Sequence, residues 1–538
     1  MYDPFYLRHS NLGLALMPSL LLAVAVVMAR LPLREAQVWR YFYWLSGAGL
    51  LATMAGLFSQ LLKTNASGAV PYAWLVQTQP GAWVALLVQL LGMVIGVFSA
   101  RYLQGESAQQ RYVAALSAVL AAVHVLLLAN HWVILITAWA VVGLALQTLL
   151  CFYTDRPFAL LAAHKKRIAD RIADALLLAA AAIAWFEVGS GSFSDLRDHF
   201  VVHEASWALQ LGAVCLVLAV ILRSALLPVH GWLIQVMEAP TPVSALLHAG
   251  VVNLGAFVLI QLSVLVETSV LARGVLVVFG LATATLGGMV MLTRVSIKVR
   301  LAWSTVAQMG FMLMQCGLGL YTLALLHLLG HSLYKAHGFL ASSSAVRETR
   351  RQIMHGPMAI APLSLLWAPL TSCLVIFAVQ ALLSAFMISG FAPWPWWWSA
   401  LLGLAWAPLL WQAGPALAAM SIRARQSVVG LALVIALSML ASLAHTLPLG
   451  TRDVHDPSHG LGSLALAGMV WLYFCLALLQ LKPRKLETWR RWSYAGFYVD
   501  EFYTRLTLRL FPAAWASAGT LRAPASLSAQ SSTATTPK

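Results

Sequence analysis

Long apolar runs alternate with short polar loops along the whole chain, and this pattern predicts an all-α polytopic membrane protein. About twenty apolar residues are enough to cross a bilayer as a helix. The first run is too long and too weakly basic at its start for a cleaved signal peptide, so we expect it to be retained. We expect about fifteen transmembrane helices, near 11–30, 43–62, 80–100, 112–130, 132–153, 172–188, 207–227, 242–266, 274–292, 301–319, 321–341, 362–391, 396–420, 428–448 and 461–481.

Basic residues gather in every second loop between these runs. The intervening loops carry few basic residues and several acidic ones, among them Glu187, Asp195 and Asp453. The positive-inside rule therefore predicts an N-terminus outside the cytoplasm and a cytoplasmic C-terminal segment. The basic loops contain Arg30, Arg34 and Arg40; Arg101 and Arg111; Arg156, Lys165, Lys166, Arg167 and Arg171; Arg294, Lys298 and Arg300; Arg347, Arg350 and Arg351; Arg423 and Arg425; and Lys482, Arg484, Lys485, Arg490 and Arg491.

The composition agrees with a membrane protein and excludes an ordinary soluble one. Hydrophobic residues make up 61% and charged residues 10% of the 538 residues. The net charge of +16 lies in the loop clusters, so it reflects membrane topology rather than nucleic-acid binding. The five cysteines lie far apart in apolar runs without a CxxC pair or an iron–sulfur spacing, and we interpret them as small buried residues.

The segment after the last apolar run differs from the rest of the chain. Residues 483–520 mix aromatic, basic and acidic residues at helical spacing, which predicts a C-terminal amphipathic helix at the membrane surface or against a partner. The tail 521–538 is small and polar, and we expect it to be disordered.

The stretch from Arg223 to Gly250 concentrates polar residues within an apolar region. Arg223 stands where a membrane helix is expected, and Pro228 then bends or breaks that helix. Glu238 and a Pro-Thr-Pro turn follow, and His248 lies on the early turns of the next apolar run. A snorkelling arginine in a helix hairpin is one interpretation. We favour an ion or proton path, because broken helices with ionisable groups at membrane depth face protein or water.

A second group is formed by His327, His331 and Lys335. The spacing of four residues puts all three on one helix face, whereas His337 points elsewhere. Such a stripe suits a proton relay, because imidazole titrates near neutrality and a buried lysine can become neutral. The alternative is a pair of histidines hydrogen-bonded within helix packing. The sequence HLLGH lacks the glutamate of HExxH and a third ligand, so we expect no metal here.

Charged residues also lie at the start of the sixth run, where Asp170 and Asp174 are one turn apart with Arg171 beside them. They suit an interfacial ion pair or a proton-delivery group, and the sequence leaves both open. No nucleophile elbow, phosphate-binding loop or deaminase motif is present, so we expect a transporter subunit without catalytic chemistry or a cofactor of its own.

Three ordered motifs resemble the antiporter-like membrane subunits of respiratory complex I and of multi-subunit sodium/proton antiporters. They are PTPVSALLHAG at 240–250, SIKVRLAWSTVAQMGFM at 296–312 and HLLGHSLYKAHGFLASSS at 327–344. The resemblance implies a helical bundle with inverted repeats, discontinuous helices and a proton path at mid-membrane. It implies an antiporter-like core at 80–350, between N-terminal helices at 1–79 and C-terminal helices at 351–482.

The chain also departs from that family's pattern. Ala140 occupies the place of the glutamate after the tryptophan of the fifth helix, and Arg223 replaces the usual lysine. Arginine does not release its proton in a protein, so Arg223 could act only as a fixed charge or as an anion-binding group. The twelfth run lacks lysine and glutamate, and Ser296 stands where an aspartate is common. The residues that match family positions are His248, Lys335, Arg171 and Asp174.

Within this superfamily the pattern, with the ending FYVDEFYTRLTLRLFP, is most similar to the membrane subunits of DAB-type inorganic carbon accumulation systems. That resemblance implies a place in the bacterial inner membrane and a partner, DabA, a large zinc protein related to β-carbonic anhydrases. The chain would then conduct H⁺ or Na⁺ to drive the partner's handling of carbon dioxide or bicarbonate. The path would comprise His248, Lys335, His331, His327, Arg223, Asp174, Arg171 and Glu238.

Two alternatives remain open. One is a subunit of a respiratory complex I-like pump or of a sodium/proton antiporter assembly, which predicts many co-purifying membrane subunits. The other is a non-conducting scaffold that anchors a soluble enzyme, which predicts that the intramembrane histidines and lysine can be replaced without loss of function.

Overall fold

The structure is a computed structural model that describes residues 12–62, 74–344, 360–386, 394–412, 420–454, 457–481 and 486–513. Within these ranges the chain forms α-helices and short 3-10 helices, with two isolated β-bridges and no sheet. The expected all-α fold is confirmed.

The helices up to the first break are mostly long. They are α1 (Leu12–Met28), α2 (Glu35–Leu62), α3 (Gln79–Tyr102), α4 (Gln109–Leu127), α5 (Trp132–Leu150), α6 (Pro157–Val188), the short α7 (Phe193–Val202) and α8 (Trp207–Arg223). Side-chain caps define several starts: Thr78 accepts a hydrogen bond from the backbone of Gly81, and Ser206 accepts one from Leu209. The sixth expected span begins fifteen residues too late at 172, because α6 continues outward through the basic residues before it.

The middle of the chain contains the discontinuous helices. It comprises α9 (Gly231–Gln235), the 3-10 turn η1 (Val236–Glu238), α10 (Thr241–Ala249), η2 (Val251–Asn253), α11 (Leu254–Gln261), α12 (Ser263–Glu267), α13 (Val270–Thr293), α14 (Ile297–Gly317), α15 (Tyr321–Leu340) and η3 (Ala341–Ser344). Helices α13 and α14 pack closely because a side chain at Gly280 would lie 2.6 Å from the carbonyl oxygen of Gly310.

The C-terminal part adds a separate set of helices. They are α17 (Pro362–Phe386), α18 (Trp396–Trp406), η4 (Ala407–Leu410), α19 (Met420–His445), α20 (His459–Leu481), α21 (Glu487–Tyr494), η5 (Gly496–Tyr498) and α22 (Val499–Leu510). The thirteenth expected span, 396–420, is too long, because α18 ends at Trp406 and residues 413–419 lie outside the described ranges.

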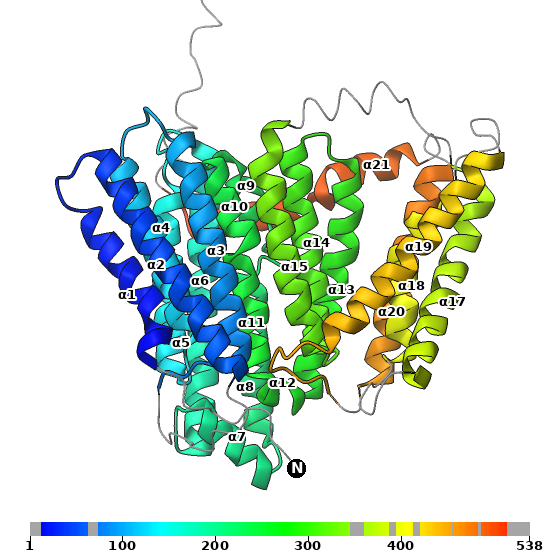
Figure 1. Cartoon of the computed structure of the whole chain (residues 1–538), viewed down its shortest axis with the longest axis horizontal. Helices are drawn as coiled ribbons and strands as arrows, with labels where there is room; N and C mark the ends of the chain where they lie inside the picture. Colours follow the sequence, from blue (N-terminus) through cyan, green and yellow to red (C-terminus); the bar gives the residue numbers. More distant parts are fainter. Residues whose placement is uncertain are drawn as a thin grey trace, which may run out of the picture.

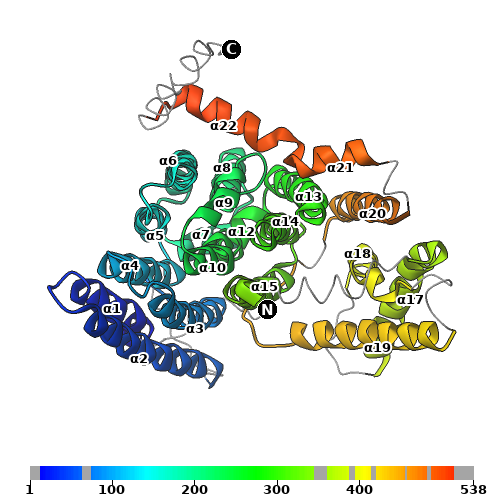
Figure 2. The same ribbon diagram turned by 90° about the horizontal axis from the view of Figure 1, so that it is seen from above.

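The long helices form a row across the molecule (Figure 1). Helices α1 and α2 lie at one end, α17 to α20 lie at the other, and the remaining long helices lie between them, as the view from above also shows (Figure 2). In the part of the chain that is described, nine helices are long and apolar enough to cross a membrane, and α1, α8 and the α18 segment are shorter apolar helices. The other three expected spans correspond to α6, α14 and α15, which carry the polar residues discussed below.

The first break follows Arg223, as Pro228 predicts. Helix α8 ends at Arg223, Ala225 has a left-handed backbone with φ of 54°, and the helix resumes only at Gly231. A proline offers no backbone donor, so the chain leaves the helix and re-enters it beyond the turn.

A second break interrupts the expected continuous helix at 242–266. Helix α10 ends at Ala249, and Gly250 has non-helical dihedrals of −124° and −74°. A side chain at Gly250 would lie 2.9 Å from the carbonyl oxygen of Leu246. His248 therefore lies on the last turn of a nine-residue helix, not on the early turns of a long one. In the most apolar 18-residue window of Thr241–Gln261, 89% of the residues are buried, so this second break lies in the interior of the bundle.

The amphipathic segment expected at 483–520 forms two helices rather than one. Gly496, Phe497 and Tyr498 all have positive φ and separate α21 from α22. Both helices run along one side of the row (Figure 2), toward the end opposite α7 (Figure 1). Helix α21 packs on α13 and α22 packs on α9, so the segment docks on this chain itself. The tail expected at 521–538 lies outside the described residues.

Candidate ion path

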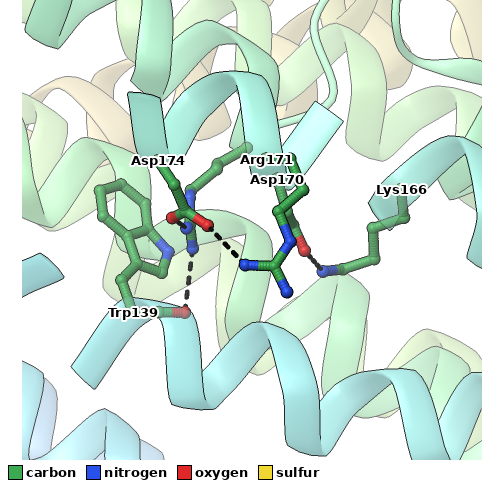
Figure 3. A network of polar contacts seen from close by, with 6 residues as sticks. Trp139, Lys166, Asp170, Arg171 and Asp174 are labelled. Carbon is green, nitrogen blue, oxygen red and sulfur yellow. Dashed lines mark hydrogen bonds and ion pairs between the residues drawn. The ribbon is translucent and has the colours of Figure 1, made fainter. Parts of the chain in front are cut away.

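Arg223 lies at the end of α8, buried against α5 and α6. One of its Nη atoms donates to a carboxylate oxygen of Asp174 on α6, and the other donates to the carbonyl oxygen of Trp139 at 2.9 Å (Figure 3). Its guanidinium also lies over the Trp139 ring, 4.7 Å from the centroid. Only 4% of the Arg223 side chain and 16% of the Asp174 side chain are exposed. The anion that this arginine holds is thus a carboxylate of the same chain.

Other charged groups of α6 extend this cluster (Figure 3). Lys166 donates to Asp170 one turn along the helix, and Arg171 lies 3.7 Å from Asp174 with 65% of its side chain exposed. Both aspartates therefore form ion pairs, and this geometry is compatible with either of the two interpretations given above. The cluster reaches from the surface at Arg171 to the buried Arg223.

The charged cluster of α6 faces small residues of α5, one of which is Ala140, at the position where the family pattern has a glutamate. Ala140 and Gly143 of α5 line a cavity of about 80 Å³ together with Asp170 and Asp174. A side chain at Gly143 would lie 3.0 Å from a carboxylate oxygen of Asp170. Small residues on α5 thus leave room for carboxylates that come from α6. The carboxylate that pairs with Arg223 therefore comes from Asp174 on α6 and not from α5.

Lys335 lies in different surroundings on α15, with 1% exposure. Its Nζ donates to the Ser304 hydroxyl and to the carbonyl oxygen of Leu301 at 3.3 Å, both on α14. None of the ion pairs in the described ranges includes Lys335. Among the described residues, the lysine therefore donates only to neutral oxygen atoms, and its Nζ also lies 5.4 Å from the centroid of the Tyr334 ring.

The buried His331 and His248 and the half-buried His327 continue from Lys335. The rings of His331 and His327 lie 5.9 Å apart, and His327 Nδ1 lies 2.8 Å from the side-chain oxygen of Gln315. The ring of His248 stacks on Phe339 at 4.5 Å, and helix α10 packs against α15. The exposed His337 points away, as expected.

Hydrogen bonding separates the two interpretations of these histidines. The bond to Gln315 agrees with the packing interpretation for His327. However, among the described residues neither ring nitrogen of His248 has a hydrogen-bond partner, and the Nε2 of His331 has none either. A buried polar atom without a partner costs about 1–3 kcal/mol, and bonding to water or an ion removes that cost. The relay interpretation fits His248 and His331 better.

The structure thus divides the expected path into two groups. Asp174, Arg223 and Arg171 lie between α5, α6 and α8, whereas the lysine and histidines lie between α10, α14 and α15. Glu238 joins neither group: it is half exposed, 3.9 Å from Arg156. No cluster of three or more His, Cys, Asp or Glu side chains in the described ranges is arranged to hold a metal ion.

Some polar residues of this region were not expected from the sequence. Ser304 and Gln315 contact Lys335 and His327 but have no distinctive spacing. Lys165, which we assigned to a basic loop, is fully buried and pairs with Asp500. No local signal could identify that pair, because its members lie 335 residues apart.

Comparisons with known proteins agree with this architecture. The family model described as NADH:quinone oxidoreductase/Mrp antiporter, TM, matches residues 129–407. A probable inorganic carbon transporter subunit DabB from Hydrogenovibrio crunogenus is 36% identical over 486 residues, covering 86% of this chain and 90% of that protein. The chain belongs to the DabB family.

Further relatives connect the DabB family with respiratory subunits. A probable inorganic carbon transporter subunit DabB2 from Halothiobacillus neapolitanus is 41% identical over 356 residues, covering 64% of each chain. An NAD(P)H-quinone oxidoreductase chain 5 from a Synechocystis species is 30% identical over 352 residues, covering 63% of this chain and 51% of that protein. The DabB family thus lies in the antiporter-like superfamily.

Solved structures share the fold. The Mrp complex from a Dietzia species matches with a TM-score of 0.62 at 20% identity, covering 95% of this chain and 60% of that chain. The membrane-bound sulfane sulfur reductase, an archaeal respiratory membrane complex, matches with a TM-score of 0.52 at 17% identity, covering 85% and 74%. This DabB-family chain is therefore a multi-pass membrane protein with the antiporter-like fold.

Proposed function

We propose that this chain is the membrane subunit of an inorganic carbon accumulation complex and that it conducts cations to drive a partner. The proposal is carried by Lys335, a buried lysine that among the described residues donates only to neutral oxygens, beside histidine nitrogens that have no hydrogen-bond partner there. Ionisable groups within a membrane protein are costly and mark ion paths. The 36% identity to a probable inorganic carbon transporter subunit supplies the substrate class.

In this proposal Lys335, His331, His327 and His248 carry the ion. An imidazole exchanges protons near neutral pH, and a buried lysine amine can lose its proton, so both groups can take up and release a proton. Arg223 and Asp174 form a fixed pair that holds α6 and α8 together beside the break. The pair would contribute a constant local field and would not itself carry the ion.

The chemistry on carbon belongs to a partner in this proposal. We expect a DabA-like zinc subunit related to carbonic anhydrases, which would hydrate carbon dioxide, while this chain supplies coupling to the cation gradient. We also place the complex in a bacterial inner membrane, with the N-terminus in the periplasm and α21 and α22 at the cytoplasmic face. The alternating basic loops support this orientation.

The main test replaces Lys335 by alanine. We expect Lys335→Ala to abolish inorganic carbon accumulation while the complex still assembles, because the relay loses its central group. His337→Ala is the matched control, since that residue lies on the same helix but is exposed, and its uptake should be normal. Uptake of labelled bicarbonate by cells and co-purification of the partner are the two measurements. Normal uptake by Lys335→Ala, or by variants of the buried histidines, would instead favour a non-conducting scaffold.

A respiratory or antiporter role is the second candidate, favoured by the 30% identity to an NAD(P)H-quinone oxidoreductase chain 5. Capture of the tagged chain from mild detergent distinguishes the two. One large zinc-bearing soluble partner supports carbon accumulation. Many membrane subunits with iron–sulfur or flavin absorption would support the respiratory role.

A further inference from the structure

The C-terminal helix α22 covers a second buried polar site beside α9. Lys165 of α6 is fully buried there, and its Nζ donates to the Asp500 carboxylate at 2.5 Å and to the Thr504 hydroxyl at 2.8 Å. Gln235, at the end of α9, donates to the other oxygen of Asp500 at 3.2 Å. Three elements that are distant in sequence therefore converge on one carboxylate.

The backbone of α9 is shaped to admit that carboxylate. A side chain at Gly231 would lie 1.4 Å from the nearer Asp500 oxygen and 2.6 Å from Lys165 Nζ. Only glycine leaves this space, so the first residue of α9 contacts both charges directly. The contact lies in the segment that resumes the helix after the first break.

The preceding residue, His230, points to a ligand of this site. It is fully buried, it lies within electrostatic range of Asp500 and Lys165, and its Nε2 has no hydrogen-bond partner. Its Nδ1 lies 3.3 Å from the carbonyl oxygen of Pro228, which leaves Nε2 to exchange a proton. A buried imidazole nitrogen with no protein partner suits a mobile proton and serves no evident packing purpose.

The site connects with Lys335 through α14. The His230 ring lies 4.9 Å from the Trp303 ring, and the next residue, Ser304, accepts the hydrogen bond from Lys335. The guanidinium of Arg294 lies over both Trp303 and Tyr494 of α21, which gives the C-terminal segment a second anchor at the same place. Two adjacent residues of α14 thus contact the two groups: Trp303 contacts His230, and Ser304 contacts Lys335.

The exposed fractions of the three side chains show which member of the site faces water. The Asp500 side chain is 24% exposed, whereas Lys165 and His230 are fully buried. Asp500 is therefore the member that reaches water at the end of the bundle covered by α22. Nitrogen groups dominate its inner side, and Na⁺ prefers oxygen ligands, so the site suits H⁺.

We propose that Asp500, Lys165 and His230 form a proton entrance at the end covered by α22, with the carboxylate supplied by the C-terminal helix. Asp500 takes a proton from water and passes it, through an intervening water because the two side chains share no direct hydrogen bond, to His230 Nε2; this restores the carboxylate and leaves an imidazolium that releases the proton toward Lys335. Lys165 stays cationic and holds the carboxylate in place. This inference rests on the proposed function and identifies its ion as H⁺.

The test measures proton flux in the complex captured with its partner and reconstituted in liposomes. A trapped pH-sensitive dye reports the flux under an imposed membrane potential. We expect Asp500→Asn, which keeps the shape but not the proton exchange, to lower the flux at least about tenfold, the effect of one lost proton-transfer group. Glu487→Gln is the matched control, because that carboxylate on α21 is 65% exposed and pairs only with its neighbour Arg491; its flux should be unchanged.

A double variant separates proton transfer from a purely structural role. Asp500→Asn alone leaves Lys165 without its counter-ion and could weaken assembly, whereas Lys165→Gln with Asp500→Asn removes both charges and keeps the polar contacts. We expect the double variant to assemble normally and still to conduct poorly. Normal flux in Asp500→Asn, or flux restored in the double variant, would overturn the proton entrance.

Lys335→Ala, measured in parallel, distinguishes this inference from the function on which it rests. If Lys335→Ala stops the flux and the Asp500 variants do not, the proposed function stands and the entrance is wrong. If Lys335→Ala conducts normally, both are wrong.

Discussion

Two buried cations of this chain, Arg223 and Lys335, have opposite electrostatic surroundings. Arg223 has a carboxylate partner in Asp174, a backbone acceptor in Trp139 and an aromatic ring beneath its guanidinium. Lys335 has a hydroxyl, a backbone carbonyl and the Tyr334 ring near it, all neutral, and none of the ion pairs in the described part of the chain includes it.

The difference separates a structural cation from a candidate conducting one. Arginine keeps its proton in a protein, and its fixed charge stabilises the Asp174 carboxylate, so neither member of this pair changes its protonation readily. A buried lysine with neutral neighbours has no such constraint and can give up its proton. Replacement of the family's lysine by Arg223 therefore removes a titratable site next to the first break and leaves the one on α15.

Loss of the Asp174 carboxylate should have the largest effect on stability. Asp174→Asn leaves the Arg223 charge buried without a partner, and we expect a loss of about 3–5 kcal/mol in the free energy of unfolding. Chemical or thermal unfolding of the detergent-solubilised protein measures this loss.

Two variants control that experiment. Glu487→Gln breaks an ion pair whose side chains are mostly exposed, and unfolding should be unchanged. Asp174→Asn combined with Arg223→Met removes both buried charges and should recover most of the lost stability. A double variant as unstable as the single one would show that the ion pair is not what Asp174 contributes.

Arg223→Lys should have an intermediate effect. The lysine can still pair with Asp174, but it loses the planar fork that also bonds Trp139 and the stacking on its ring. We expect a loss of about 1–2 kcal/mol in the same unfolding assay, with carbon accumulation preserved. A loss as large as that of Asp174→Asn would mean that the contacts with Trp139, and not the charge pair, hold α8 in place.

Lys335→Met should have the smallest effect on stability, within about 1 kcal/mol, because no opposite charge is left behind. Ser304 keeps its own hydrogen bond to the carbonyl oxygen of Leu301 at 2.8 Å. Carbon accumulation should nevertheless be lost. Destabilisation as strong as that of Asp174→Asn would contradict the contrast between the two cations, because it would show that Lys335 also has a charged partner.

Much of the fold could be predicted from local patterns in the sequence. Apolar runs located every expected helix, because the cost of leaving a backbone polar group unpaired in lipid makes a long apolar run helical wherever it occurs. Pro228 located the first break, and the four-residue spacing placed His327, His331 and Lys335 on one face.

Predictions of features that depend on tertiary packing were less accurate. The expected helix at 242–266 is broken at Gly250, and glycine alone does not distinguish a break from a close contact. The C-terminal segment is two helices because three successive residues take positive φ, which only their contacts with the bundle stabilise. Arg223 was expected to be a fixed charge, and the structure adds that Asp174 neutralises it.

The sequence by itself determined that this chain is a helical membrane protein of the antiporter-like type, where its helices lie and which ionisable residues enter them. The helices and their ionisable residues follow from hydropathy and helical periodicity, which act over one to a few turns, whereas the antiporter-like type follows from the resemblance of three motifs. The tertiary structure decided which charges meet: Asp174 with Arg223 across 49 residues, and Lys165 with Asp500 across 335. Such pairings depend on how helices pack, and packing is set by contacts between distant segments that no local pattern encodes.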